Sequence, residues 1–204
     1  MSDAKRDLPV TNTPPPSAQA RLVWPLALTI GLAGPAQADG EFFQADYAEN
    51  AGSITATVQR DRITVSLGWS ESEAGAARSL WANYGLPVAG NTWLRIGPSI
   101  RLDAAATTDW GLRAGLERYT TSGANSLFLL ADFNTIQREY LALAQWGHMP
   151  TGLAFEVVMQ GNDAGYRERS LTASLRIGNG PLRLRAGYRF DSGQPFIGVS
   201  INTF

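Results

Sequence analysis

The segment SLTASLRIGNGPLRLRAGYRF, residues 170–190, alternates apolar and polar side chains on both sides of a central Asn179-Gly180 dipeptide. Alternation with a period of two residues predicts β-strands that carry one apolar and one polar face. Asn-Gly is a strong signal for a two-residue hairpin turn, because both turn positions require positive φ. The segment is therefore predicted to be a β-hairpin with two chemically different faces.

The turn fixes which side chains of this hairpin lie opposite one another. The predicted pairs are Gly178 with Pro181, Ile177 with Leu182, Leu175 with Leu184, Ala173 with Ala186 and Leu171 with Tyr188. On the other face, Arg176 lies opposite Arg183 and Ser174 lies opposite Arg185. A hairpin with this register is apolar on one side and carries arginine residues on the other.

Similar segments of about ten residues, separated by short turns, continue through the chain and predict antiparallel strands. They cover residues 42–49, 53–60, 62–71, 77–86, 92–102, 109–119, 125–134, 138–148, 151–160, 167–177, 181–190 and 194–204. A turn at Arg60-Asp61 would pair Val58 with Ile63, Ala56 with Val65 and Ile54 with Leu67. Segments 77–86 and 138–148 are apolar on both faces, so the pattern leaves their orientation open. We expect one all-β domain with twelve strands, and a barrel of eight or ten strands is the alternative.

The N-terminal region has the organisation of a secretory signal peptide. Arg21 precedes an apolar run, LVWPLALTIGLAG, which ends before an Ala36-Gln37-Ala38 sequence. A positive flank, a short apolar core and a small-residue box are the three parts of such a peptide. We expect residues 1–38 to be removed and residues 39–204 to be exported. A short helix of a soluble domain is the alternative interpretation.

Two features favour a transmembrane barrel over a soluble periplasmic β-sandwich that acts as a binding protein. The polar faces hold no lysine, whereas a solvated surface usually does. Aromatic residues lie near segment ends, as expected for interfacial girdles; they are Phe43, Tyr47, Trp69, Trp110, Trp146, Tyr188 and Phe190. One arginine that faces lipid at the membrane midplane costs about 2–4 kcal/mol, so Arg183, Arg185 and Arg189 should face the lumen. The fold class is an antiparallel up-and-down β-barrel.

The signal peptide, the ten-residue segments and the terminal GVSINTF together resemble a small, porin-like outer-membrane β-barrel of Gram-negative bacteria. The resemblance implies residence in the outer membrane among its lipids, with both chain ends in the periplasm. It also implies contact with the barrel-assembly machinery, for which Phe204 would be the sorting signal. Ile197, Val199 and Ile201 are out of phase with Phe204, which predicts a bulge near the end or a weaker signal.

Charged residues on the polar phase of the strands are the candidates for a functional lumen. The candidate lumen arginines are Arg62, Arg95, Arg101, Arg113, Arg176, Arg183, Arg185 and Arg189, and the candidate lumen carboxylates are Glu117, Asp132 and Glu156. One interpretation is a lumen braced by arginine–carboxylate pairs. The other is a cationic path for an anionic solute or polysaccharide, with Arg176 and Arg183 as a like-charge pair. The protein would act as a small pore, or as an envelope accessory such as those of exopolysaccharide export.

Composition argues against several other functions. The chain has no cysteine and a formal net charge of −1, so we expect neither thiolate metal sites nor a nucleic-acid partner. A lipid-modifying hydrolase is the rival class, but His148 is the only histidine and has no adjacent serine. We therefore expect no catalytic residues, no metal and no cofactor.

Overall fold

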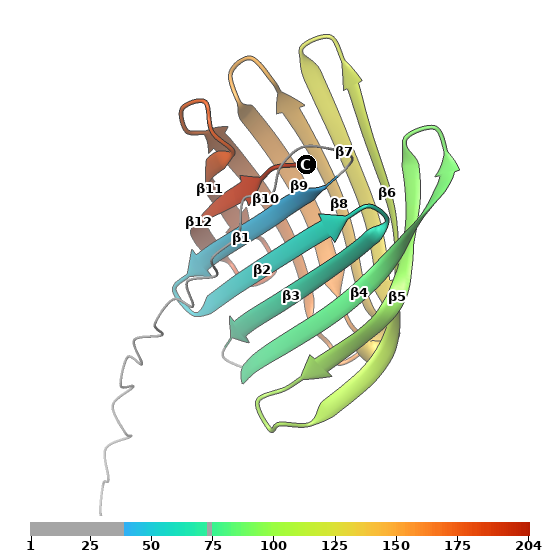
Figure 1. The fold of residues 1–204 in the computed structure, drawn as a ribbon. Helices are drawn as coiled ribbons and strands as arrows, with labels where there is room; N and C mark the ends of the chain where they lie inside the picture. Colours follow the sequence, from blue (N-terminus) through green and yellow to red (C-terminus); the bar gives the residue numbers. More distant parts are fainter. Residues whose placement is uncertain (1–38, 73–74) are drawn as a thin grey trace, which may run out of the picture. The chain divides into compact units, whose positions relative to one another are not determined.

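The computed structural model describes residues 39–72 and 75–204, and these residues form a closed antiparallel barrel (Figure 1). Its strands are β1 (Gly40–Ala48), β2 (Ala51–Arg60), β3 (Ile63–Ser72), β4 (Gly75–Ala89), β5 (Thr92–Leu102), β6 (Thr108–Ser122), β7 (Asn125–Asn134), β8 (Glu139–His148), β9 (Leu153–Gly161), β10 (Arg167–Arg176), β11 (Leu182–Arg189) and β12 (Gln194–Asn202). Each strand pairs with its neighbours in sequence, and β12 pairs with β1. A 3-10 helix, η1 (Ile136–Arg138), links β7 to β8. No helix within these ranges is long and apolar enough to cross a membrane.

The predicted barrel of twelve strands is confirmed, and the sandwich and the smaller barrels are wrong. Two strands, β5 and β7, have the predicted bounds, and the others differ by a few residues at their ends. The expected signal peptide, residues 1–38, lies outside the described residues.

The β10–β11 hairpin has the predicted register but a different turn. Arg176 pairs with Arg183, and the apolar pairs up to Leu171 with Tyr188 are as expected. The positive φ lies at Gly178 (62°) and not at the Asn-Gly dipeptide. A two-residue turn would need a hydrogen bond from the N–H of residue 181, and a proline there has none. The chain instead closes the hairpin one pair earlier, where the N–H of Ile177 donates to the carbonyl of Leu182 at 2.8 Å.

The β2–β3 register was predicted incorrectly. Val58 pairs with Val65, because the turn consists of residues 61–62 and not of residues 60–61. Asp61 takes the positive φ of 53° that this turn requires, and aspartate tolerates this conformation better than most residues. The pairing moves by an even number of residues, so every side chain keeps its predicted face.

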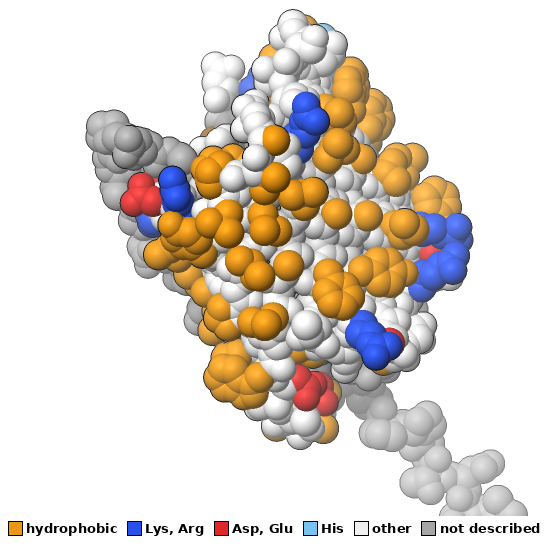
Figure 2. All heavy atoms as spheres, turned by 90° about the vertical axis from the view of Figure 1, so that its right-hand side faces the viewer, with side chains coloured by type: hydrophobic (Ala, Val, Ile, Leu, Met, Phe, Trp, Pro, Cys, Tyr) orange, Lys and Arg blue, Asp and Glu red, His pale blue; other side chains and the backbone are white. Residues whose placement is uncertain are grey.

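The outer surface of the barrel carries an apolar band. Leu67 and Leu184, for example, are each 52% exposed. Outward-facing charged residues lie near strand ends; they are Glu41, Arg60, Glu71, Arg78, Arg118, Arg167 and Arg169. Figure 2 shows one face of the barrel, where hydrophobic side chains spread over the surface and charged ones gather toward its margins.

Aromatic side chains border this band. Tyr47 and Trp110, which are 67% and 73% exposed, lie close to the end of the barrel that holds the 103–107 loop. Trp146 and Phe155 stack with their ring centroids 6.1 Å apart near the opposite end, where the chain terminates. We call this second end the C-terminal mouth. Apolar surface between two aromatic borders is the exterior that a bilayer covers.

The chain leaves β12 after Asn202, and the register up to that residue has no bulge. The side-chain Oδ1 of Asn202 accepts the N–H of Phe204 at 2.9 Å, and the N–H of Thr203 donates to the carbonyl of Glu41 at 3.0 Å. The ring of Phe204 lies on Gly40, where a Cβ would overlap it. The predicted bulge is therefore not found in β12 up to Asn202, and the role of Phe204 in sorting stays a prediction.

Candidate functional site

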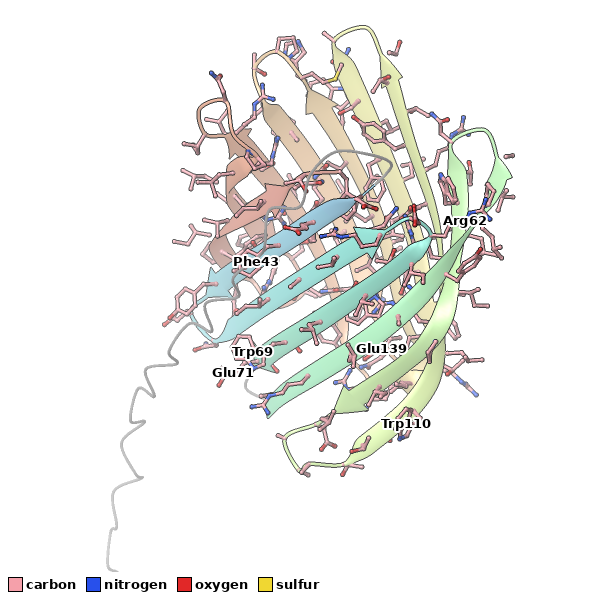
Figure 3. All side chains as sticks on the ribbon, in the orientation of Figure 1. Phe43, Arg62, Trp69, Glu71, Trp110 and Glu139 are labelled. Atoms are coloured by element: carbon pink, nitrogen blue, oxygen red, sulfur yellow. The ribbon has the colours of Figure 1, made fainter. Side chains whose placement is uncertain are left out.

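Alternate side chains of every strand face the lumen, and burial identifies which ones. In β11, Arg185 is 6% exposed whereas its neighbour Leu184 faces outward. By the same register the inward positions hold Arg95, Arg101, Arg113, Arg176, Arg183, Arg185, Arg189, Glu117, Asp132 and Glu156. Arg62 does not belong to this set. It lies in the exposed β2–β3 turn (Figure 3), because the turn falls one residue later than the sequence predicted.

One wall of the lumen is held by a buried ion-pair cluster centred on Arg185. Its Nε lies 3.0 Å from Oδ1 of Asp46 on β1, and its Nη2 lies 3.0 Å from Oε1 of Glu156 on β9. The three side chains are 4%, 7% and 9% exposed, so water is largely excluded from them. We call this cluster and the strands that carry it, β9 to β12 and β1, the braced wall.

The braced wall depends on a glycine for its geometry. Gly198 of β12 pairs with Asp46 on one side and with Arg185 on the other. A Cβ at Gly198 would overlap Oδ1 of Asp46. Because this position has no side chain, the carboxylate and the guanidinium meet across the strand that separates them.

The opposite wall carries three arginines on β5 and β6. Arg95 and Arg101 face inward from β5, and Arg113 lies between them in height because it pairs with Gly97. We call these three residues the arginine ladder. Each is paired with a carboxylate. Arg95 and Arg113 pair with Glu117 and Asp132 on the adjacent strand, and Arg101 pairs with Glu139 on β8, which lies beyond β6 and β7.

Hydrogen bonds orient Arg95 and Arg113, the two ladder residues that lie nearer the C-terminal mouth. The Nε of Arg95 donates to Glu117 at 2.7 Å, and its terminal nitrogens donate to Thr64 at 2.7 Å and Gln59 at 2.8 Å. The Nε of Arg113 donates to Oδ1 of Asp132 at 2.7 Å. The Arg113 guanidinium also lies 4.0 Å from the ring centroid of Trp81, a cation–π contact.

The Arg185 cluster and the ladder differ in how far water reaches their charges. The ladder side chains of Arg95, Arg113 and Arg101 are 15%, 19% and 22% exposed, against 4% for Arg185. All four point into the barrel, so the exposed area of the ladder faces space inside the lumen. The ladder therefore holds guanidinium groups that are paired but still partly accessible.

Arg176 and Arg183 lie opposite one another at the C-terminal mouth, as predicted from the hairpin register. Arg183 donates to the carbonyl of Gly152 at 2.6 Å, and Arg176 donates to the carbonyl of Met149 at 3.0 Å. Within residues 39–72 and 75–204, neither arginine has a carboxylate within salt-bridge distance. The pair binds the β8–β9 turn through backbone oxygen atoms. Elsewhere, Arg189 lies 5.3 Å from the ring centroid of Phe196.

Several carboxylates that face the lumen were not predicted from the sequence; they are Asp46, Asp109, Glu139 and Glu168. Glu139 begins β8, whose sequence is apolar on both faces, so alternation could not orient it. Asp46 could have been found, because it alternates with the outward-facing Tyr47. With these residues, the lumen has a more even balance of charge than the sequence predicted.

At the mouth opposite the C-terminal mouth, Glu168 and Asp191 tie the β11–β12 turn to β10. The buried Glu168 accepts the N–H of Asp191 at 2.9 Å and that of Ser192 at 3.2 Å. Asp191 accepts two hydrogen bonds from the Arg169 guanidinium, at 2.9 and 3.0 Å. These bonds lower the pKa of the Asp191 carboxyl below its ordinary value.

His148 ends β8 on the outward phase. Its Nδ1 lies 2.9 Å from Oγ1 of Thr151, and its ring stacks on Trp146 at 6.4 Å. In the part of the chain that the structure describes, no three histidine, cysteine or acidic side chains gather as metal ligands.

A closed antiparallel barrel with an apolar exterior and a polar, charged lumen defines the class of outer-membrane β-barrels. Solved structures share this fold. KdgM porin matches with a TM-score of 0.54 and 9% identity over 79% of this chain and 98% of the KdgM chain. KdgM porin in complex with disordered oligogalacturonate matches with the same TM-score of 0.54 and 9% identity. NanC porin has a TM-score of 0.49 and 10% identity, and the match covers 80% of this chain and 99% of the NanC chain. No protein-family model and no curated protein matches the sequence.

Proposed function

We propose that the protein is an outer-membrane channel for small solutes and that the arginine ladder forms its path for anions. The observation that carries the proposal is the unequal exposure of the Arg185 cluster and the arginine ladder. The buried Arg185 cluster leaves no accessible charge for a solute, whereas the ladder guanidiniums keep 15–22% of their side-chain surface accessible inside the barrel.

The exterior supports the membrane location. Charged side chains on the outward phase lie near strand ends, and large apolar residues such as Val65, Leu112 and Val157, which are 44–59% exposed, lie between them. In water this surface would favour aggregation, because contiguous apolar patches of this kind are rare on soluble monomers. When the acyl chains of a membrane cover this surface, its removal from water is favourable.

The ladder has the chemistry that weak anion binding requires. A guanidinium has five N–H donors, and a single carboxylate partner leaves some of them unused. The hydrogen bonds of Arg113 to described residues use only Nε, so its terminal N–H groups are available to a passing anion. Because Asp132 already offsets part of the charge, an anion binds weakly enough to leave, as conduction requires. KdgM porin, which shares the fold, has been solved with an oligomer of an acidic sugar.

The test is ion selectivity in planar bilayers. Arg95→Gln combined with Arg113→Gln leaves Glu117 and Asp132 unpaired in the lumen, so we expect a several-fold shift of the permeability ratio from anions toward cations. Arg118→Gln is the matched control, because this arginine is also on β6 but faces outward. Unchanged selectivity in the double variant would overturn the anion path, and absence of conductance in the unmodified protein would overturn the channel.

The proposal assigns no catalytic role to His148 or to any other residue. A role in exopolysaccharide export stays a prediction.

A further inference from the structure

The lumen of the barrel is not polar on every strand. Five large apolar side chains face inward from β7, β8 and β9; they are Phe128, Leu130, Leu141, Leu143 and Val158. Their direction follows from the register, because they alternate with outward residues and share their phase with Asp132, Gln145 and Glu156. Leu143 pairs with Leu130 on one side and with Val158 on the other, so the set is continuous across three strands. We call these five residues the apolar lumen patch.

The patch is not a packed core. Each of its members is partly exposed, and none belongs to the buried apolar residues of the described chain, which are Ala48, Ala77, Ile136, Ala154 and Phe196. Side chains that face inward and are still accessible must border open space in the lumen. Apolar surface in contact with water is unfavourable by itself, and the lumens of this class are normally polar.

The patch lies directly beside the arginine ladder. Leu141 pairs with Asp132, the carboxylate partner of Arg113. Trp81 lies on the other side of that arginine, with its ring 4.0 Å from the guanidinium. A cation with unused N–H donors is therefore bordered by indole on one side and by leucine and valine on the other.

We infer that the preferred solutes of this channel are organic anions with an apolar body, such as aromatic carboxylates. The inference rests on the proposed function and names the solute class of the same lumen. The carboxylate hydrogen-bonds to the terminal N–H groups of Arg113, and the ring or chain covers Leu130, Leu143 and Val158. A sugar acid of equal charge is disfavoured at this position, because its hydroxyl groups lose water against leucine side chains that offer no hydrogen bond.

The experiment measures equilibrium binding to the folded barrel in detergent by tryptophan fluorescence, with 3-phenylpropionate and galacturonate as probes. Trp81 lies beside the site, and Trp81→Phe shows which part of the signal comes from it. We expect 3-phenylpropionate to bind about tenfold more tightly than galacturonate, in line with the preference that an apolar pocket gives. Leu143→Ser should remove this preference, and Ala144→Ser, which changes the outward neighbour, should keep it.

Val158→Thr has nearly the same shape as the original residue and provides a second variant in case Leu143→Ser does not fold. Equal binding of the two probes, or a preference that survives both patch variants, would overturn the inference. The channel is judged separately by bilayer conductance. A barrel that conducts anions without the preference refutes only the solute class, and a barrel that shows the preference without conductance refutes only the channel.

Discussion

The Arg185 cluster and the arginine ladder place the same chemical groups in different surroundings. On the braced wall, Arg185 contacts two carboxylates and is 4% exposed. On the ladder wall, Arg113 contacts one carboxylate and is 19% exposed. A guanidinium with its donors shared between two buried acids is positioned to stabilise the barrel, whereas one with unused donors and partial exposure is the group that we propose to meet solutes. The number of partners and the access of water distinguish the two roles, and the residue type does not.

The largest expected effect comes from replacing the central residue of the braced wall. Arg185→Met leaves Asp46 and Glu156 buried without a cation, and breaking a buried pair of this kind costs about 3–5 kcal/mol. Arg113→Met is the matched change on the ladder wall, where it leaves one partly accessible carboxylate unpaired and should cost about 1–3 kcal/mol. The free energies of unfolding in urea, followed by the gel shift between folded and boiled barrel, measure both values.

Combining Arg185→Met with Asp46→Asn and Glu156→Gln removes the orphaned charges and should recover much of the stability. Equal losses for Arg185→Met and Arg113→Met would break the distinction between the walls.

A smaller effect is expected at the glycine that lets the braced wall form. Gly198→Ala places a methyl group where Oδ1 of Asp46 and the carbonyl of Ala45 lie, and overpacking of this kind costs about 1–3 kcal/mol. Gly180→Ala is the control, because no atom lies within 4 Å of a Cβ at that turn position. The free energies of unfolding of the two variants, measured in urea, should therefore differ clearly. If the Gly198→Ala barrel is as stable as the control, the side chain of Asp46 can move away from the added methyl group and the close approach is not required.

The smallest effect tests whether the bracing extends to the β11–β12 turn. Asp191→Asn removes the carboxylate whose pKa is lowered by its hydrogen bonds to Arg169. A lowered folded-state pKa means that the ionised form stabilises the barrel above the ordinary pKa of 3.8, and that this contribution disappears as pH falls through the folded value. The variant should thus melt slightly lower than the unmodified barrel at pH 7, and the difference should vanish in acid. Asp163→Asn, in the β9–β10 loop, is the control; a pH-independent difference would contradict the assignment.

The sequence predicted the barrel well because its main signal is local. Alternation identifies strands and faces residue by residue, and it correctly placed Arg95, Arg113 and Arg185 toward the lumen. A turn can move by one residue without disturbing this pattern, which is why the β2–β3 register was wrong while its faces were right.

The partners of the lumen side chains could not be predicted in the same way. The pair between Arg185 and Asp46 joins residues separated by 139 positions, and only closure of the barrel brings them together. The apolar patch was hidden for a related reason. The segment that became β8 is apolar on both faces, so no alternation revealed that Leu141 and Leu143 face inward.

The junction between β1 and β12 has a consequence for how the barrel assembles. Every other pairing joins strands that follow one another in the chain, so only this junction has a high contact order. Such distant pairings form slowly, because the entropy of closing a long loop must be lost first. Until β12 arrives, β1 and β11 each present an unpaired edge that other chains can join. We expect closure at this junction to be the slow step of folding, and truncation of the last strand to yield aggregates and not a smaller barrel.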